Sequence, residues 1–583
     1  MSKKAKQSSF MGNVVIILFA QILVKLLGVI YRMVITNIDG FGDAGNGFYT
    51  AGFQVYTVLL AISSVGIPNA IAKLVSERAA LGDYKGADRI FKSAFKMFSV
   101  IGLVFSLLLF FGADFVAQTI IGIPGVSYVM RALSPSIFFV CVSSVIRGYF
   151  QGLNDMQATS RSQVYEQIFK CGLTVLLVEL CVGSMPLIMQ LLTHYTMLYG
   201  GSMDSTPPEI MAAWANAASS IAAALSFIYI VFYYLRKRSA LQKQIKQSNA
   251  PTLTGSTKKI LWTILSLSIP ISLASIITAV NRVIDTATIA RGIAAAYSAY
   301  IPAHGTVAAI VNPTAQQLSD EAVRLSGMLS KSDTIINMPL TLNIAFATVL
   351  VPTIAAALAK GDRKEASSKT SYSFLISTLL ILPCCIGMIV LAKPIYGLLY
   401  HNAPMGYDLL ALMAVSLIFS ALAQTVNGSL QGIGKVFVPA MGIAVGCIIK
   451  LILNLTLIRI PSVNIYGAAI SSILCQISSF LVSFIVMRKY IDIKLTPVKY
   501  IVKPVTASVI MGIAAFVIYK LVTLVMGTGL LGNAIGLLAA VLCAVIIYAG
   551  LVIAFKILEK DEIMLLPSGA KLYGLLVKLG LYK

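Results

Sequence analysis

Apolar runs of about twenty residues recur along the whole chain and constrain its fold more than any other feature. A run of this length is what an α-helix needs to cross the hydrocarbon core of a bilayer. Of the 583 residues, 58% are hydrophobic and only 11% are charged, whereas roughly a quarter of the residues in soluble domains are charged. The pattern predicts an all-α polytopic membrane protein with about fourteen transmembrane helices. These spans are expected at 12–36, 47–75, 92–117, 127–149, 161–183, 212–235, 259–289, 331–358, 371–399, 406–429, 436–459, 465–487, 501–526 and 531–556.

The formal net charge of +23 is carried largely by short segments that follow every second apolar run. Arg236, Lys237 and Arg238, after the sixth run, are one such segment. Basic residues in alternate loops are typical of the cytoplasmic side of a membrane protein. The distribution therefore predicts that both termini are cytoplasmic and that the charges face membrane lipids, and it argues against a nucleic-acid partner.

Known catalytic and metal-binding motifs are missing from the sequence. The eight cysteines show no metal-ligand spacing, and there is no phosphate-binding loop of the G-x-x-x-x-G-K-[ST] type. No catalytic residue, metal site or cofactor is expected, and the chain is predicted not to be an enzyme. Transport would then depend on a coupling cation, the membrane potential or the gradient of the substrate itself.

An internal repeat divides most of the chain into two halves. The segment RGYFQGLNDMQATSRSQVYEQIFK begins at Arg147, and NGSLQGIGKVFVPAMGIAVGCIIK begins at Asn427. Four residues of the first segment recur 280 positions later, namely Gly148, Gln151, Gly152 and Lys170 as Gly428, Gln431, Gly432 and Lys450. Each half holds an even number of spans, so the two lobes should be parallel. We expect six-helix lobes over 1–240 and 241–490 around a central cavity, two extra helices and a cytoplasmic tail over 491–583, and alternating access.

The first span carries two basic residues, Lys25 and Arg32, seven positions apart. This separation puts both side chains on nearly the same face of a helix. Charges inside a span usually face a cavity or a partner, so the two residues predict a basic stripe for an anionic substrate. Alternatively, Arg32 reaches the lipid headgroups at the end of the helix.

Further charges lie inside other spans. Arg282 and Asp285 are three residues apart, a spacing that suits either a structural ion pair or a joint role in the cavity. Glu166 and Lys170 are four apart; they could pair, or Glu166 could contact a cation or substrate. Lys450 has no acidic residue four positions earlier, which favours a cavity or headgroup role. The candidate substrate-binding residues are therefore Lys25, Arg32, Glu166, Arg282, Asp285 and Lys450.

Three segments resemble a known family: GDAGNGFY (Gly42–Tyr49), IPNAIAKL from Ile67, and above all RGYFQGLNDMQATSRSQVYEQIFK. Together they resemble the polysaccharide-biosynthesis and stage V sporulation protein B branch of the MOP exporter superfamily, which includes MurJ-type lipid II flippases of Gram-positive bacteria. The resemblance extends over residues 10 to 560. It implies fourteen helices, a bacterial cytoplasmic membrane location and export of an undecaprenyl-diphosphate-linked saccharide, with lipid II for peptidoglycan synthesis as the expected cargo. Cell-wall synthesis proteins are candidate protein partners.

The chain departs from the MurJ-type pattern in its charged residues. That pattern has a basic residue before Leu-Gly in the first helix, followed by an Arg-Asp pair, and arginines in the second and eighth helices. Here Lys25 and Arg32 take the basic places, but Met33 stands where the Asp would be. Thr334 takes the eighth-helix place, and no arginine lies near Leu59. Arg282 and Lys450 are the candidates to supply the missing cations.

Other functions remain open on the sequence alone. A flippase for another lipid-linked polysaccharide would carry the same basic residues. A cation-coupled multidrug exporter of the MATE type would need acidic residues in the cavity, and few are present. A membrane-embedded glycosyltransferase would need a catalytic carboxylate in the long segment 291–327, where Asp320 and Glu321 stand; the repeat argues against it.

Overall fold

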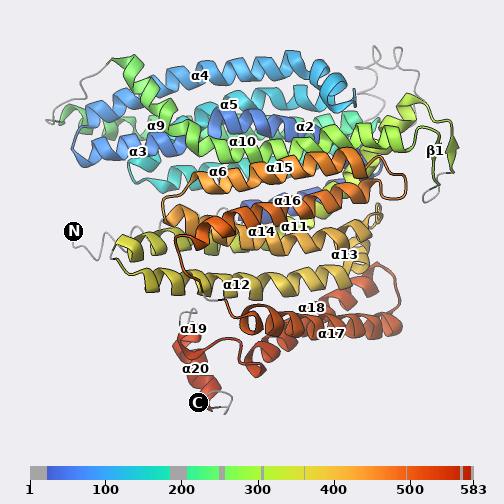
Figure 1. The fold of residues 1–583 in the computed structure, drawn as a ribbon. Helices are drawn as coiled ribbons and strands as arrows, with labels where there is room; N and C mark the ends of the chain where they lie inside the picture. Colours follow the sequence, from blue (N-terminus) through green and yellow to red (C-terminus); the bar gives the residue numbers. More distant parts are fainter. Residues whose placement is uncertain are drawn as a thin grey trace. The chain divides into compact units, whose positions relative to one another are not determined.

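The computed structural model describes residues 23–183, 206–248, 256–303, 308–359, 361–493, 495–564 and 569–578. These residues are helical almost throughout (Figure 1). Eleven helices in this part of the chain are long and apolar enough to cross a membrane. The all-α polytopic class is therefore confirmed, while the count of fourteen spans stays a prediction. The first predicted span begins outside the described residues.

The chain packs into two compact units, and the first comprises Met1–Lys331 with Lys450–Ala468. It opens with a helix described over 23–36. Its further helices are α2 (Gly42–Leu60), η1 (Ala61–Val65), α3 (Ile67–Ala80), α4 (Tyr84–Phe115), η2 (Val116–Ile121), α5 (Val126–Gly152), α6 (Met156–Gly183), α9 (Pro208–Lys246) and α10 (Thr257–Ala296). Within this unit α5 packs against α2, α3, α4 and α9, and α10 packs against α2 and α3.

The second unit comprises Ser332–Ile449 with Ala469–Lys583. Three of the described helices contribute to both units: α11 (Ala315–Ala359), α15 (Phe437–Leu457) and α16 (Ile465–Arg488). The others are α12 (Arg363–Val390), α13 (Ala392–Leu399), α14 (Tyr407–Gly432), η3 (Val498–Val502), α17 (Lys503–Met526), α18 (Leu530–Ala554), α19 (Lys560–Met564) and α20 (Gly569–Lys578). The lobe boundaries expected from the repeat stay a prediction.

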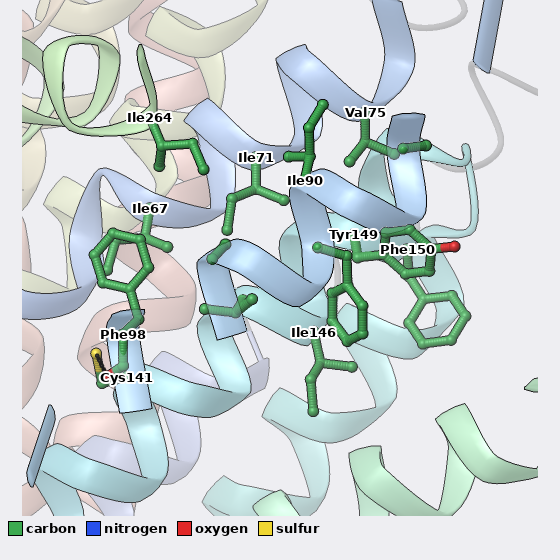
Figure 2. Close-up of a cluster of buried hydrophobic side chains, with 14 of the residues drawn as sticks. Ile67, Ile71, Val75, Ile90, Phe98, Cys141, Ile146, Tyr149, Phe150 and Ile264 are labelled. Atoms are coloured by element: carbon green, nitrogen blue, oxygen red, sulfur yellow. Dashed lines mark hydrogen bonds between the residues drawn. The ribbon is translucent and has the colours of Figure 1, made fainter. Parts of the chain in front are cut away.

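A buried apolar cluster holds the helices of the first unit together (Figure 2). Helix α3 contributes Ile67, Ile71 and Val75, which recur every four residues and so lie on one face of the helix. They meet Ile90 of α4 and Tyr149 of α5. Because this face is buried inside the protein, it fixes the arrangement of α3, α4 and α5 independently of the surrounding lipid.

The sequence repeat is also a repeat of local structure. Gly82 and Gly361 both have a positive φ, at 75° and 76°, a conformation that glycine adopts without strain. The next residue, Asp83 or Asp362, caps the following helix by accepting a hydrogen bond from a backbone N–H, at 2.7 Å and 2.8 Å. The α3–α4 and α11–α12 connections are therefore equivalent.

A second pair of repeat positions marks close helix packing. A Cβ at Gly152 would lie 2.7 Å from Val75 Cβ, and one at Gly432 would lie 3.0 Å from Ile354 Cβ. Real Cβ atoms do not approach this closely without a shift of their neighbours. Both glycines therefore allow the helix that ends in the repeat motif to pack tightly, α5 on α3 and α14 on α11.

The segment 291–327, expected as a long connection, is mostly ordered secondary structure. Helix α10 continues to Ala296, and a short antiparallel pair of strands follows, β1 (Tyr300–Ile301) and β2 (Ile310–Val311). Helix α11 then begins at Ala315, well before the predicted start at 331. Thr314 and Gln317 form a reciprocal capping box there: each backbone N–H donates to the other side chain. The expectation of a loop was wrong because this first part of α11 is too polar to register as a span.

Candidate functional site

The first described helix presents its two basic residues differently. Lys25 is exposed, whereas Arg32, two turns later, is half-buried. One Arg32 nitrogen donates to Thr50 Oγ1 at 2.8 Å and to Ser330 Oγ at 2.6 Å. The guanidinium carbon also lies 4.4 Å from the centre of the Tyr49 ring. All of these partners are neutral, so they orient Arg32 without supplying a counter-charge from the part of the chain that the structure describes.

Lys170, on α6, is a further basic residue that the predicted site omitted. Its Nζ lies 4.8 Å from the centre of the Phe53 ring and 5.6 Å from that of Tyr31. Tyr31 and Tyr49 share a hydrogen bond of 2.9 Å between their hydroxyl groups. Lys170 therefore lies against the same aromatic side chains as Arg32, and cation–π contacts hold it there. Its recurrence as Lys450 in the repeat was the signal for a special role.

Glu166 does not pair with Lys170, which was one of the two alternatives that their spacing left open. Glu166 instead accepts a hydrogen bond from Arg147 at 2.7 Å, across from α6 to α5. Arg147 is buried and also donates to Ser162 and Ser226, each at 3.0 Å. A buried arginine needs a counter-charge, and Glu166 supplies it. Glu166 is thereby a structural partner of the RGYFQG motif.

Asp285 does not pair with Arg282 either, which was one of the two alternatives that their spacing left open. Asp285 pairs with Lys450 of α15 at 2.5 Å, and Asn454 donates to the second carboxylate oxygen at 3.0 Å. Asn454 also donates to Thr288 at 2.8 Å. Lys450, expected without an acidic partner, is therefore neutralised by a residue from another helix. Sequence spacing could not reveal this pair because its members are far apart in the chain.

Arg282 is left without this acid, and it joins a group of basic residues. Both Lys25 and Arg282 are exposed, and the positive charges of Arg282 and Lys170 act on Lys25. We define the cation group as Lys25, Arg32, Lys170 and Arg282. Within the described residues, none of the four forms an ion pair with a carboxylate. The structure thus brings together three of the six predicted site residues and adds Lys170.

One more buried ion pair lies in the same unit. Lys331 of α11 is 1% exposed, and its Nζ lies 2.5 Å from Asp43 Oδ1 in the first turn of α2. Sequence reasoning looked for a basic residue at Thr334 and missed Lys331, one turn earlier. Asp43, Glu166 and Asp285 therefore each have a basic partner. The residues of the cation group, in contrast, have no acidic partner among the described residues. The arrangement is suited to binding an anion.

The fold is that of a polytopic α-helical membrane protein, and solved transporters share it. The structure matches an inward-facing multidrug resistance MATE family transporter of the MOP superfamily with a TM-score of 0.61 and 14% identity, over 81% of this chain and 94% of the other. It matches a structure titled lipid II flippase MurJ, inward closed conformation, with a TM-score of 0.60 and 15% identity, over 94% and 98% of the two chains.

Two family models match different parts of the sequence. The model described as polysaccharide biosynthesis protein matches residues 10–358, and that described as lipid II flippase MurJ matches residues 316–542. The first covers more than half of the chain, which therefore belongs to the polysaccharide biosynthesis protein family.

Curated relatives in Bacillus subtilis (strain 168) extend the likeness over most of the chain. The chain is 25% identical to "Lipid II flippase MurJ" over 513 residues, which is 85% of each protein. It is 23% identical to "Stage V sporulation protein B" over 566 residues, which is 97% of this chain and 98% of the relative.

Proposed function

We propose that this protein moves a polyprenyl-diphosphate-linked saccharide, with lipid II as the principal cargo, from the inner to the outer leaflet of a bacterial cytoplasmic membrane. The observation that carries the proposal is the cation group, whose four positive charges lack an acidic partner among the described residues. The lipid II flippase relative supports this choice of cargo. Alternating access is the proposed mechanism.

The chemistry of the cargo suits these residues. A diphosphate carries about two negative charges, and charge-assisted hydrogen bonds from Lys and Arg are roughly twice as strong as neutral ones. Lys25 and Arg282 are exposed and so can reach such a group, while Arg32 and Lys170 are held by hydroxyl and aromatic side chains. In surroundings of low dielectric, four basic residues attract a diphosphate far more strongly than they would in water.

A cation-coupled drug exporter is the competing function, because MATE transporters share the fold. A cationic drug needs an available carboxylate in the cavity. Asp43, Glu166 and Asp285 each form an ion pair with Lys331, Arg147 and Lys450. Since these acids are already neutralised, the described site favours an anionic cargo over a cationic one.

The membrane topology and energy source belong to the same proposal. The alternation of basic segments supports cytoplasmic termini, so the cargo would enter from the side that carries Arg236–Arg238. A coupling cation or the membrane potential would supply the energy. Cell-wall synthesis proteins remain the proposed protein partners.

Direct binding by the purified protein tests the proposed cargo. Undecaprenyl diphosphate should bind the wild-type chain in detergent, and the Lys25→Ala/Arg282→Ala variant should bind it about tenfold or more weakly, because two charge-assisted contacts are lost. Lys489→Ala removes a basic residue directly after α16 (Ile465–Arg488) and is the matched control, with unchanged binding expected. Equal binding by the double variant and the wild type would contradict the proposal. Binding of a cationic drug but not of the diphosphate would favour the exporter.

A further inference from the structure

A second site in the first unit lies where η2, α10 and α15 meet. A pocket of about 520 Å³ opens there, a volume typical of sites for small ligands. Its walls include the apolar side chains of Ile120, Leu451 and Leu455, and two guanidinium groups, those of Arg291 and Arg459, line it. This combination of apolar walls with two arginines matches a ligand that is apolar at one end and anionic at the other.

Tight packing places the two arginines in one pocket. Gly292 of α10 lies against the buried Ile458, and a Cβ at Gly292 would stand 2.5 Å from Ile458 Cγ2. Only a glycine allows this approach. Because Arg291 precedes Gly292 and Arg459 follows Ile458, the contact brings both guanidinium groups to the same pocket.

The positive charges of the pocket are not neutralised by the acids nearby. Arg291 donates to the backbone oxygen of Thr119, a neutral acceptor. Asn454 lines the pocket, but its amide is engaged with Asp285, which already pairs with Lys450. Neither Arg291 nor Arg459 forms an ion pair with a carboxylate in the part of the chain that the structure describes. The pocket therefore keeps two positive charges.

The apolar wall of the pocket is open to the surroundings. Ile120, Leu451 and Leu455 are 40%, 40% and 44% exposed. Leu451 and Leu455 belong to α15, one of the helices long and apolar enough to cross a membrane. The pocket therefore offers exposed apolar surface beside two arginines, which suits a ligand with an apolar chain and an anionic group better than it suits a soluble ion.

We infer that this pocket binds the phosphate headgroup of an anionic membrane lipid. The guanidinium groups of Arg291 and Arg459 would bind the phosphate oxygens, for which their planar fork is well shaped, while the lipid chain lies along Leu451 and Leu455. Basic pockets between transmembrane helices bind anionic headgroups in this way. The site is separate from the cation group: Arg291 follows Arg282 by nine residues, roughly 13 Å along α10. It does not depend on the proposed cargo.

Native mass spectrometry of the full-length chain in detergent tests this inference. Phosphatidylglycerol, undecaprenyl diphosphate and phosphatidylcholine are titrated separately against the wild type, Arg459→Gln and Arg291→Gln/Arg459→Gln. We expect the double variant, in which the cation group is intact, to bind one anionic lipid fewer, with that binding step weakened about tenfold, and to bind phosphatidylcholine with unchanged affinity. Lys393→Ala, which removes a cation in α13 that lies over Tyr407, is the control with no expected loss.

The lipid arms distinguish the source of the phosphate. A loss limited to undecaprenyl diphosphate assigns the pocket to the cargo carrier; a loss that includes phosphatidylglycerol assigns it to a bulk lipid. Unchanged affinities in the double variant would overturn the inference, as would an equal loss in Lys393→Ala or displacement of the lipid by an equal concentration of inorganic diphosphate. Arg459 is exposed, so the single variant provides a folded protein if the double variant is unstable.

Discussion

Charge compensation between helices decides which residues remain available to a ligand. Spacing along one helix suggested the pairs Arg282–Asp285 and Glu166–Lys170, yet Asp285 pairs with Lys450 and Glu166 with Arg147. Both observed pairs connect different helices, because a charge in surroundings of low dielectric is stabilised by whichever counter-charge the packing brings nearest. As a result, Lys25 and Arg282 have no carboxylate partner among the described residues.

The ion pair of Lys450 with Asp285 should be strongly coupled. Lys450→Ala leaves the Asp285 carboxylate without its counter-charge, and we expect a loss of about 3–5 kcal/mol in the free energy of unfolding. Replacing both residues by leucine should recover most of that loss, since no uncompensated charge remains. Chemical unfolding in detergent micelles measures both effects.

The matched control for the Lys450 and Asp285 substitutions is Lys435→Ala, which removes an exposed lysine that lies over the Tyr490 ring. Its effect on the free energy of unfolding should stay within about 0.5 kcal/mol. The losses in the free energy of unfolding caused by replacing Lys450 alone and Asp285 alone should not add up to the loss caused by replacing both. If they did, the two residues would not be coupled, and the assignment of Asp285 to Lys450 would fail.

Arg32 provides a second prediction at the scale of the residue. Its partners Thr50 and Ser330 are neutral, so Arg32→Ala removes a positive charge without leaving an acid unpaired. We expect the variant to insert normally and to lose the ability to rescue cells depleted of lipid II flippase. Thr50→Val removes one acceptor while keeping the charge, and it should still rescue growth. Full rescue by Arg32→Ala would show that this residue is not needed for transport.

At the scale of the helix, close packing at the repeated glycines determines stability. A methyl group at Gly152 would lie 2.7 Å from Val75 Cβ and 2.8 Å from the backbone oxygen of Ala72. Gly152→Ala should therefore force α5 away from α3 and lower the free energy of unfolding by about 1–3 kcal/mol. The same substitution at Gly172 of α6 meets no atom within 4 Å and should be neutral or stabilising. Equal losses at the two positions would show that close packing is not the cause.

Helix positions were largely predictable because a run of about twenty apolar residues has the composition and the length of a membrane-spanning helix. The predicted span 465–487 matches α16 (Ile465–Arg488), and 531–556 matches α18 (Leu530–Ala554). The start of α11 was missed because charged side chains such as Glu321 and Lys331 lower the mean hydropathy of this segment below that of a membrane span. Its own signal was the capping box that Thr314 forms with Gln317.

The candidate site was predictable only in part. Lys25, Arg32 and Arg282 could be found because a charge inside an apolar run stands out by itself. Lys170 was set aside because Glu166 stands four residues earlier, and nothing in the sequence reveals that Arg147 takes this acid instead. The pocket at Arg291 and Arg459 could not be foreseen, since it depends on the contact between Gly292 and Ile458.

At the scale of the whole molecule, the fold alone does not choose the cargo. The MOP fold is shared by MATE drug transporters and by a lipid II flippase. The choice rests on charge: the acids Asp43, Glu166 and Asp285 each form an ion pair, and the cation group has no carboxylate partner in the described ranges of the chain. Membership in the polysaccharide biosynthesis protein family agrees with an anionic, lipid-linked saccharide as the cargo.

The most direct test measures lipid II on the outer leaflet of cells that depend on this protein for export. Depletion should lower the amount of lipid II that an external label reaches, and the wild-type gene should restore it. The Lys25→Ala/Arg282→Ala variant, produced and inserted at the same level, should fail to restore it. Outer-leaflet lipid II that is unchanged on depletion, or fully restored by the double variant, would contradict the proposed transport through the cation group.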